Sequence, residues 1–216
     1  MFKGAIFDLD DTLLDVLDFH YKAWEEALRP FGVDFTLEEY SEYMGNKGTR
    51  IAADIIRKYN LDIKPESLFN KKIELVTKWF KTKPLKIKPS AKEAIEFFIN
   101  QGVKVAVATG GPRDETMVKL ERSGLLPFFD TVVCMEDVNM GKPNPDIYIK
   151  TANKIGLKPE DCIAFEDTEY GLLSAKRAGM ICVVFPNKAS EKQDLSEADL
   201  KISDFRQAID WVKKQS

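Results

Sequence analysis

The stretch GAIFDLDDTL, residues 4–13, places a short, mainly apolar run directly before three carboxylates. The apolar run has the length and composition of a buried β-strand. Asp8, Asp10 and Asp11 fall within four positions at its end, where like charges disfavour one another's ionised form. Because a fold gains nothing from this repulsion, the cluster indicates a site in which a cation offsets it.

The bulk composition is that of an ordinary globular protein. Of 216 residues, 44% are hydrophobic and 31% are charged, which is enough for one sizeable core with a smaller second unit. The formal net charge is −3, so the chain lacks the excess of positive charge that nucleic-acid-binding proteins carry, and nucleic acid is a poor candidate partner. The sequence has no apolar run of membrane-spanning length and no signal-peptide pattern, so we expect a cytoplasmic protein that binds no membrane.

The cysteines argue against a disulfide framework or a cysteine metal site. Cys134, Cys162 and Cys182 are odd in number, lack C-x-x-C spacing and lie in apolar runs. These features predict buried thiols in a reducing compartment.

From about residue 90, strand and helix patterns alternate regularly. A capping-box pattern at Ser90 and an Asn144-Pro145 pair predict helix starts. The expected strands are residues 103–108, 131–135, 162–165, 181–185 and, more weakly, 200–202. Strands that are apolar on both faces and alternate with amphipathic helices predict an α/β fold, with a doubly wound, Rossmann-like parallel sheet covered on both sides.

Residues 15–83 break this alternation. They show only helical patterns, over residues 19–28, 37–43, 48–59 and 66–80, which is too much chain for a simple crossover. We therefore predict a helical cap domain, residues 15–83, inserted into a catalytic core made of residues 1–14 and 84–216. The ends of such an insertion lie close together, which suits a hinge.

Polar residues gather where the predicted strands end. Taken singly, each has an ordinary explanation as a turn, a helix cap or a solvated side chain. In an open parallel sheet, however, these ends converge on one ligand-binding edge. The residues concerned are Asp8 and Asp10, Thr109 with Gly110 and Gly111, Lys142, and Glu166 with Asp167.

These residue types indicate phosphoryl transfer assisted by a divalent cation. Asp8, Asp10 and Asp167 offer the hard oxygen ligands that Mg²⁺ prefers. Lys142 and Thr109, with the free amides around Gly110 and Gly111, would bind phosphoryl oxygens. The spacing of two sends Asp8 and Asp10 to the same side of an extended chain, so one can attack phosphorus while the other reaches the bridging oxygen. That division requires Asp10 to be able to hold a proton.

Four segments resemble the motifs of the haloacid dehalogenase superfamily. They are FDLDDTL at 7–13, TGG at 109–111, GKPNPDIY at 141–148 and FEDTEYG at 165–171. The resemblance covers nearly the whole chain and points to the branch with a small helical cap, which holds phosphoglycolate phosphatase-like enzymes and β-phosphoglucomutase.

The resemblance implies a role for each matching residue. Asp8 would be the nucleophile that forms an aspartyl phosphate, and Asp10 would protonate the leaving oxygen, then activate water, and ligate Mg²⁺ through its main-chain carbonyl. The remaining roles are phosphoryl binding by Thr109 and Gly110, neutralisation of the phosphoryl group and orientation of Asp8 by Lys142, metal ligation by Asp167, and support of a metal-bound water or of the site by Glu166.

The cap decides between phosphatase and mutase. His20, the only histidine, stands where β-phosphoglucomutases carry one, and it either bridges the cap to Asp10 or merely packs. Val16 and Met44 depart from the mutase pattern, which has threonine and lysine there. Lys47 and Arg50 could bind a distal group of the substrate or could be solvated. We predict a Mg²⁺-dependent phosphatase of small phosphomonoesters such as sugar phosphates, with β-phosphoglucomutase second.

A phosphorylatable receiver-like module is the main alternative of another class. Receivers also gather acids, a threonine and a lysine around Mg²⁺, but they lack an inserted helical cap. For the enzyme we expect a small phosphorylated metabolite as partner and a monomer or weak dimer. Asp11 has no catalytic task in this scheme, and we predict a turn or cap role for it.

Overall fold

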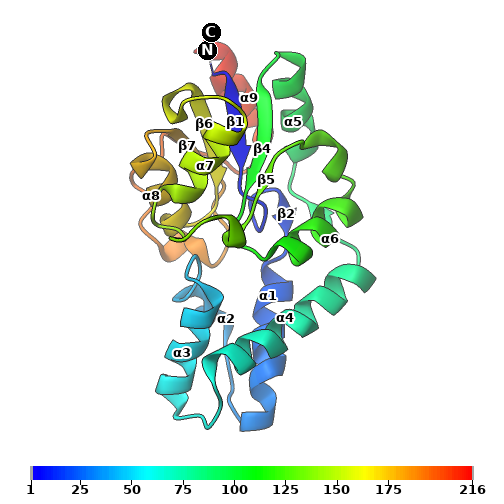
Figure 1. Ribbon diagram of the computed structural model, residues 1–216, viewed down its shortest axis with the longest axis vertical. Helices are drawn as coiled ribbons and strands as arrows, with labels where there is room; N and C mark the ends of the chain where they lie inside the picture. Colours follow the sequence, from blue (N-terminus) through cyan, green and yellow to red (C-terminus); the bar gives the residue numbers. More distant parts are fainter. Residues whose placement is uncertain (1, 216) are drawn as a thin grey trace.

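Six parallel strands form the centre of the structure, a computed structural model that describes residues 2–215. Their order across the sheet is β5-β4-β1-β6-β7-β8, so β1 lies in the middle (Figure 1). The strands are β1 Gly4–Phe7, β4 Lys104–Ala108, β5 Val132–Val133, β6 Cys162–Glu166, β7 Ile181–Val184 and β8 Leu200–Lys201. The polar residues after β1 therefore project from the centre of the sheet edge.

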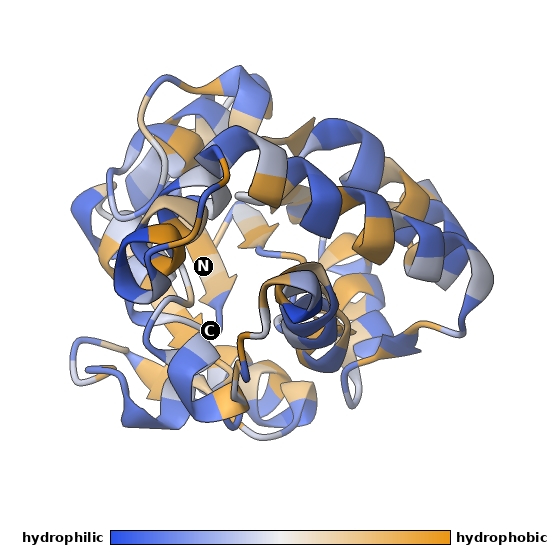
Figure 2. Cartoon of the chain, turned by 90° about the horizontal axis from the view of Figure 1, so that it is seen from below, coloured by the Kyte–Doolittle hydropathy of each residue, from blue (hydrophilic) through white to orange (hydrophobic). Residues whose placement is uncertain are grey.

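Both faces of the sheet are buried, as the apolar strands predict. Ala5, Ile6 and Phe7 are fully buried, and the Phe7 ring stacks on Phe165 of β6 with centroids 4.6 Å apart. Figure 2 shows hydrophobic strands surrounded by helices with hydrophilic outer surfaces. Two apolar clusters, one on each side of the sheet, hold the layers together.

Helices cover the two faces of the sheet. Those packed in the first cluster are α5 Ala91–Asn100, α6 Arg113–Ser123 and α9 Phe205–Lys214, and those in the second are α7 Asp146–Lys154 and α8 Glu169–Arg177. This arrangement confirms the predicted α/β class and doubly wound parallel sheet.

The cap helices are α1 Leu17–Leu28, α2 Leu37–Ser41, α3 Gly48–Tyr59 and α4 Pro65–Thr82. They lie beyond the carboxyl ends of the strands (Figure 1) and share an apolar cluster that includes Trp24, Phe35 and Ile55. The chain enters and leaves them through β2 Leu14–Asp15 and β3 Lys86–Ile87, which pair antiparallel. The exact division into a cap, 15–83, and a core, 1–14 and 84–216, stays a prediction.

Some local predictions are wrong. Ser90 precedes α5 with φ of 58° and its side chain makes no capping hydrogen bond, so the capping box is not formed. Pro145 is the N-cap of α7, one position before the helix that it was predicted to begin. The strand predicted over 131–135 is only Val132–Val133, because a 3₁₀ turn begins at Met135.

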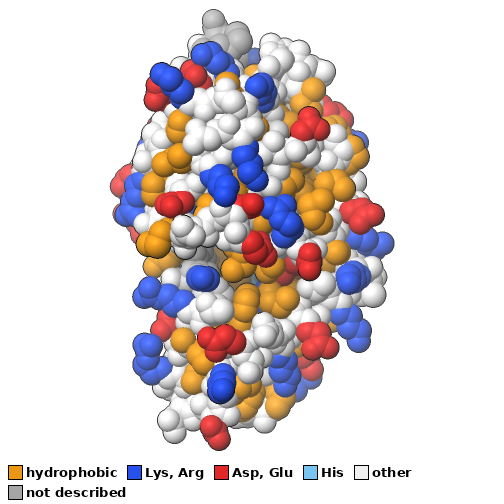
Figure 3. Space-filling model, in the orientation of Figure 1, with side chains coloured by type: hydrophobic (Ala, Val, Ile, Leu, Met, Phe, Trp, Pro, Cys, Tyr) orange, Lys and Arg blue, Asp and Glu red, His pale blue; other side chains and the backbone are white. Residues whose placement is uncertain are grey.

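The cysteines and the surface agree with the composition. Cys134, Cys162 and Cys182 are buried free thiols. Within residues 2–215 no helix is both long and apolar enough to cross a lipid bilayer. On the face drawn in Figure 3, acidic and basic side chains are intermixed rather than gathered by sign.

Candidate active site

A cavity of about 180 Å³ lies between the carboxyl ends of the strands and the cap helices. It is lined by residues from both sides, so a ligand in it would contact the sheet edge and the cap together. Among the predicted site residues, those that line it are Asp8, Asp10, His20, Thr109, Gly110, Gly111, Lys142, Glu166 and Asp167.

Lys142 joins two carboxylates at the base of this cavity. Its Nζ donates to Asp8 Oδ1 at 2.6 Å and to Glu166 Oε1 at 2.5 Å. Burial alone would lower the pKa of Lys142, but the two carboxylates outweigh it and raise that pKa. Glu166 also accepts from Tyr148 Oη at 2.5 Å. The Lys142 ammonium is therefore a fixed positive charge beside Asp8.

Asp8, Glu166 and Asp167 form a group that fits a divalent cation. One ligand oxygen from each lies within 4.8 Å of the others. Burial raises the pKa of Asp8 to about 7 against the opposing Lys142 charge, and burial followed by the Asp8 carboxylate raises that of Asp167 well above its usual range. These three carboxyl groups share a single ammonium, that of Lys142, so a further cation would stabilise their ionised forms. Hard carboxylate oxygens are the donors that Mg²⁺ takes.

Neighbouring side chains hold Asp167 in place. Asn187 Nδ2 donates to Asp167 Oδ2 at 2.8 Å, and Thr12 Oγ1 donates to Asp167 Oδ1 at 3.4 Å. Such bonds orient a ligating carboxylate. Glu166 owes its position partly to Gly171, since a Cβ there would lie 1.9 Å from Glu166 Oε2.

The loop after β4 presents a hydroxyl and a free amide. Thr109 is buried, and its Oγ1 accepts from the Gly111 amide at 3.1 Å. The Gly110 amide makes no hydrogen bond to any residue between 2 and 215. A Cβ built on Gly110 would meet nothing within 4 Å, so this part of the loop is open to a ligand.

Asp11 has the structural task that was predicted for it. It takes φ of 61°, and its Oδ1 accepts from the amides of Val16 and Leu17 at 3.0 and 2.8 Å. These amides lie at the start of α1, where helix N–H groups lack partners. The third carboxylate of the cluster therefore shapes the turn into the cap.

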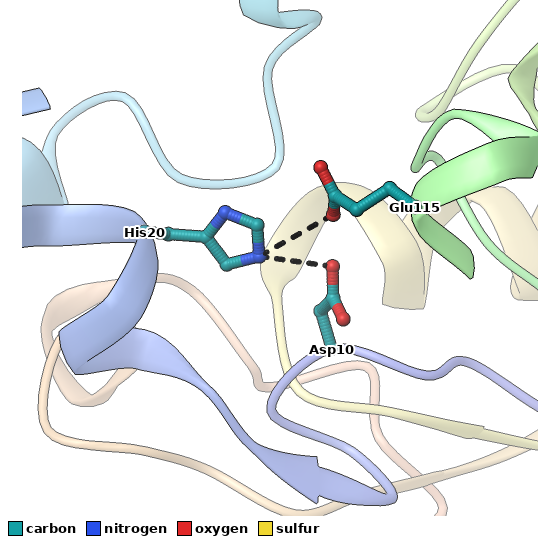
Figure 4. A group of neighbouring side chains, drawn as sticks. All are labelled: Asp10, His20 and Glu115. Atoms are coloured by element: carbon teal, nitrogen blue, oxygen red, sulfur yellow. Dashed lines mark hydrogen bonds and ion pairs between the residues drawn. The ribbon is translucent and has the colours of Figure 1, made fainter. Parts of the chain in front are cut away.

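The side chain of Asp10 contacts Lys119 of α6 and His20 of the cap. Lys119 Nζ donates to both of its oxygens at 2.6 Å, and His20 Nε2 lies 3.1 Å from Oδ2 (Figure 4). Lys119 also donates to Glu115 at 2.7 Å. The Asp10 carboxylate forms a second group with His20 and Glu115, whose ligand atoms lie within 4.8 Å of one another. The resemblance implies ligation of Mg²⁺ through the main-chain carbonyl of Asp10 instead.

This environment contradicts the expectation that Asp10 readily holds a proton. Burial alone would raise the pKa of Asp10, but the Lys119 ammonium and the His20 hydrogen bond outweigh it and hold that pKa well below its usual range. The predicted division of roles required the pKa of Asp10 to be the higher of the two. The two pKa values do differ, but that of Asp8 is raised and that of Asp10 is lowered. Asp10 is ionised in this arrangement because Lys119 neutralises it.

His20 bridges the cap to Asp10, one of the two alternatives for this residue. Lys72 Nζ of α4 lies 2.7 Å from His20 Nδ1. Burial and the Lys72 charge lower the pKa of His20, so the ring is neutral. An ammonium can only donate, so Nδ1 accepts and Nε2 carries the hydrogen given to Asp10. The cap therefore contacts Asp10 through the His20 tautomer that carries its hydrogen on Nε2.

Lys47 and Arg50 are not brought to the cavity. Neither lines it, and both are exposed. Arg50 Nε lies 3.8 Å from Asp54 Oδ2, one helical turn further along α3. Their role in binding a substrate receives no support from this arrangement and stays a prediction.

Three charged residues near Asp10 were missed in the sequence. Lys119 is fully buried, Glu115 is 2% exposed and Lys72 is 5% exposed. The spacing of four between Glu115 and Lys119 was readable, but such a pair on a helix is usually a surface pair. Nothing local in the sequence marks Lys72 as the partner of His20.

Comparison with known proteins identifies the family of this chain. The family model described as haloacid dehalogenase-like hydrolase matches residues 5–185. Fructose-1-phosphate phosphatase YqaB of Escherichia coli (strain K12) is 32% identical over 184 residues, 84% of this chain and 95% of that protein.

Two solved structures extend the likeness. CbbY from Rhodobacter sphaeroides in complex with phosphate matches with a TM-score of 0.86 and 26% identity, over 95% of both chains. β-Phosphoglucomutase from Clostridium difficile matches with a TM-score of 0.85 over 99% of this chain and 96% of that one, but its 19% identity shows the fold alone. The sequence motifs and the fold of the present chain, together with the match to the family model, establish that the chain belongs to the haloacid dehalogenase-like hydrolase family.

Proposed function

We propose that the protein is a Mg²⁺-dependent phosphatase of small phosphomonoesters such as sugar phosphates. The observation that carries this is the Lys142 ammonium held against Asp8 at the base of the cavity. A nucleophilic carboxylate, a fixed cation and the free Gly110 amide meet where a phosphoryl group would fit. The likeness to a fructose-1-phosphate phosphatase supports the substrate class.

The reaction would run in two steps at Asp8. An Asp8 oxygen attacks phosphorus and the bond from phosphorus to the ester oxygen breaks. The leaving oxygen takes a proton from Asp10, which must first bind that proton from solvent because it is ionised in the arrangement described above. Water then attacks the phosphorus of the aspartyl phosphate, its proton passes to Asp10, and phosphate leaves as Asp8 is restored. Lys142 and Thr109 would hold the phosphoryl oxygens throughout.

Asp8 and Asp167, the main-chain carbonyl of Asp10 and the nearby Glu166 would hold Mg²⁺. The metal would supply positive charge to the phosphoryl oxygens and offset the repulsion among the carboxylates. The predicted cytoplasmic location and monomer or weak dimer stay predictions from the sequence.

A phosphate-release screen tests the proposed function. Phosphomonoesters of different leaving groups, each assayed with Mg²⁺ and with EDTA, should release free phosphate only with the metal. Absence of release from every ester in the presence of Mg²⁺ would reject the phosphatase.

The contact of His20 with Asp10 at 3.1 Å favours a phosphomutase as the second candidate, since a cap that closes on Asp10 can exclude water. With β-glucose 1-phosphate and a bisphosphate primer, a mutase yields glucose 6-phosphate. We expect free phosphate instead. Formation of glucose 6-phosphate as the main product would reverse the order of the two candidates.

Asp10→Asn should separate the two steps when an aryl phosphate is the substrate. An aryl leaving group needs no proton, so formation of the phosphoenzyme should continue, while loss of the base slows its hydrolysis by about 10²–10⁴-fold. Phosphoenzyme should therefore accumulate, which acid quench and intact-mass measurement would detect. An unchanged steady-state rate would reject the acid–base role of Asp10.

Mg²⁺ should stabilise the fold, and more so at higher pH. The pKa of Asp8 rises from 3.8 to about 7 on folding, so the metal-free protein retains protons that the unfolded chain releases, and it loses stability as pH rises through that range. Mg²⁺ replaces those protons. With saturating Mg²⁺ we expect thermal unfolding to rise by about 5–10 °C near pH 8 and by less near pH 5.5.

Asp167→Asn provides the control, because it removes a ligand from the same group. Its melting temperature should respond little to Mg²⁺ at either pH. An equal Mg²⁺ response in the wild type at both pH values would contradict the displacement of protons.

A further inference from the structure

The β7–β8 loop, residues 185–199, contacts the proposed metal ligand Asp167 through Asn187. Asn187 is 7% exposed, and its Nδ2 donates to Asp167 Oδ2 at 2.8 Å. Its Oδ1 accepts from the amides of Ala189 and Ser190 at 2.8 and 3.0 Å. One side chain therefore holds both Asp167 and the turn that follows Asn187 in the loop.

The main chain of Asn187 is held as firmly as its side chain. The amide of Asn187 donates to Ser190 Oγ at 2.9 Å, and Ser190 is fully buried. The carbonyl of Asn187 accepts from the amides of Ser190 and Glu191 at 3.1 and 3.0 Å. Because every polar group of Asn187 is engaged, the position of its side chain depends on the conformation of the loop.

The same turn contacts the cap. Ala189 is 2% exposed and belongs to the apolar cluster of the cap helices, together with Tyr40 and Met44. Gln193 Nε2 donates to the carbonyl of Met44 at 3.4 Å, while Gln193 Oε1 accepts from the amide of Glu169 at 2.9 Å. The loop thus provides an apolar contact and a hydrogen bond to the cap segment that follows α2.

This attachment is separate from the hinge. Figure 1 shows the β7–β8 loop (orange) directly above the cap segment between α2 and α3 (cyan), whereas β2 leads into α1 and β3 follows α4. In that segment the cap also approaches Tyr170, since a Cβ on Gly45 would lie 3.0 Å from Tyr170 Cβ. Lys192 pairs with Glu38 at 2.6 Å, but both side chains are exposed, and such a pair contributes little.

Asp167 and the cap therefore lie at the two ends of one ordered turn. Hydrogen bonds from neighbouring groups orient a ligating carboxylate and strengthen metal binding. A cation that fixes the Asp167 carboxylate also fixes the partner of Asn187 Nδ2, and with it the turn that carries Ala189 and Gln193. The chain has a continuous set of contacts from the metal site to the cap.

We propose that the β7–β8 loop couples the metal site to the cap. Asn187 is a positioning residue for Asp167, and the turn that it anchors restrains the cap when Mg²⁺ is bound. This rests on the metal site of the proposed function and adds a link from that site to the cap. Because such coupling is reciprocal, docking of the cap strengthens the binding of Mg²⁺ by the same factor.

Asn187→Ala tests the metal end of the coupling. The Kd of Mg²⁺, measured by calorimetry well below the melting temperature, should rise about 10–100-fold, as expected when a group that orients a ligand is lost. A purely structural role would lower the melting temperature in EDTA and leave this Kd unchanged. Asn153→Ala, an exposed asparagine on α7, should keep the wild-type Kd. A Kd for Asn187→Ala within threefold of the wild type would overturn the proposal.

Hydrogen exchange of the cap tests the other end. In the wild type, Mg²⁺ in place of EDTA should slow amide exchange in peptides covering residues 36–48 by about threefold or more, because docking protects them. Gln193→Ala leaves Asn187 opposite Asp167 but removes the bond to Met44, so it should still bind Mg²⁺ and lose half or more of this slowing. Asn187→Ala at saturating Mg²⁺ should lose it as well.

Lys192→Met is the matched control for the exchange measurement. It removes the exposed pair with Glu38 from the position next to Gln193 and should keep the full slowing. Residues 36–48 have the same sequence in every variant, so their exchange rates compare directly. Absence of slowing in the wild type, or equal slowing in Gln193→Ala and the wild type, would overturn the proposal.

Neither measurement depends on turnover, so the two proposals can fail separately. If the wild type hydrolyses esters with Mg²⁺ while Asn187→Ala and Gln193→Ala match it in Kd and exchange, the coupling is wrong and the phosphatase stands. If no ester is hydrolysed but the expected Kd and exchange differences are found, the phosphatase is wrong and the coupling stands. If calorimetry detects no binding of Mg²⁺ to the wild type, both the proposed metal site and the coupling are wrong.

Discussion

Asp8→Asn should abolish hydrolysis of p-nitrophenyl phosphate and of sugar phosphates, lowering kcat by about 10⁴-fold or more. The amide keeps the size of the carboxylate but cannot attack phosphorus or form an acyl phosphate. No other described carboxylate is held by Lys142 in the same way except Glu166, which Tyr148 also engages. Steady-state phosphate release measures the loss.

Folding must be intact for this result to assign the nucleophile. Because burial already raises the pKa of Asp8 to about 7, a neutral amide there should not unfold the metal-free protein, and its circular dichroism and melting temperature should match the wild type near neutral pH. Asp130→Asn, an exposed acid just before β5, should retain full activity. Residual turnover by Asp8→Asn above a tenth of the wild-type rate would place the nucleophile elsewhere.

Lys142→Met should be damaging to both activity and stability. The side chain of Lys142 is 8% exposed, and it neutralises Asp8 and Glu166, whose side chains are 8% and 1% exposed. Its removal leaves two carboxylates buried without their cation, so we expect a loss of about 3–5 kcal/mol in the free energy of unfolding. Urea denaturation measures this loss near neutral pH, and kcat should fall with it.

A second substitution distinguishes lost neutralisation from lost packing. Adding Glu166→Gln to Lys142→Met removes one of the stranded charges and should recover part of the stability, but not the activity. Lys192→Met provides the matched control, since Lys192 pairs with Glu38 on the surface and its loss should leave the urea midpoint unchanged. No recovery in the double variant would contradict the electrostatic explanation.

The sheet and the phosphoryl-binding side of the site were predictable because each depends on local sequence. A buried strand such as residues 162–166 is an uninterrupted apolar run, and the polar residue that follows it must lie at the sheet edge. Asp8, Thr109, Lys142 and Asp167 can therefore be grouped by their positions in the sequence alone. The predicted capping role of Ser90 is wrong for a local reason, because its left-handed backbone takes the side chain away from the helix amides.

The residues around Asp10 were not predictable in the same way. Lys119, Lys72 and Asp10 come from α6, α4 and the turn after β1, and which of them meet depends on how each helix is rotated against the sheet. Helix spacing alone cannot fix that rotation. The same limit explains Arg50, which has a suitable charge and lies near the cavity loop, yet pairs with Asp54 along its own helix.

The short pairing of β2 with β3 has an evolutionary consequence. Since Leu14 is opposite Ile87 and Asp15 is opposite Lys86, the chain leaves the sheet and returns to it at nearly one point. Insertions, deletions or a wholly different set of helices between those two places would leave the register of β1 against β4 and β6 unaltered. Substrate choice can therefore diverge by exchange of one continuous segment, while the residues that handle phosphate are inherited unchanged.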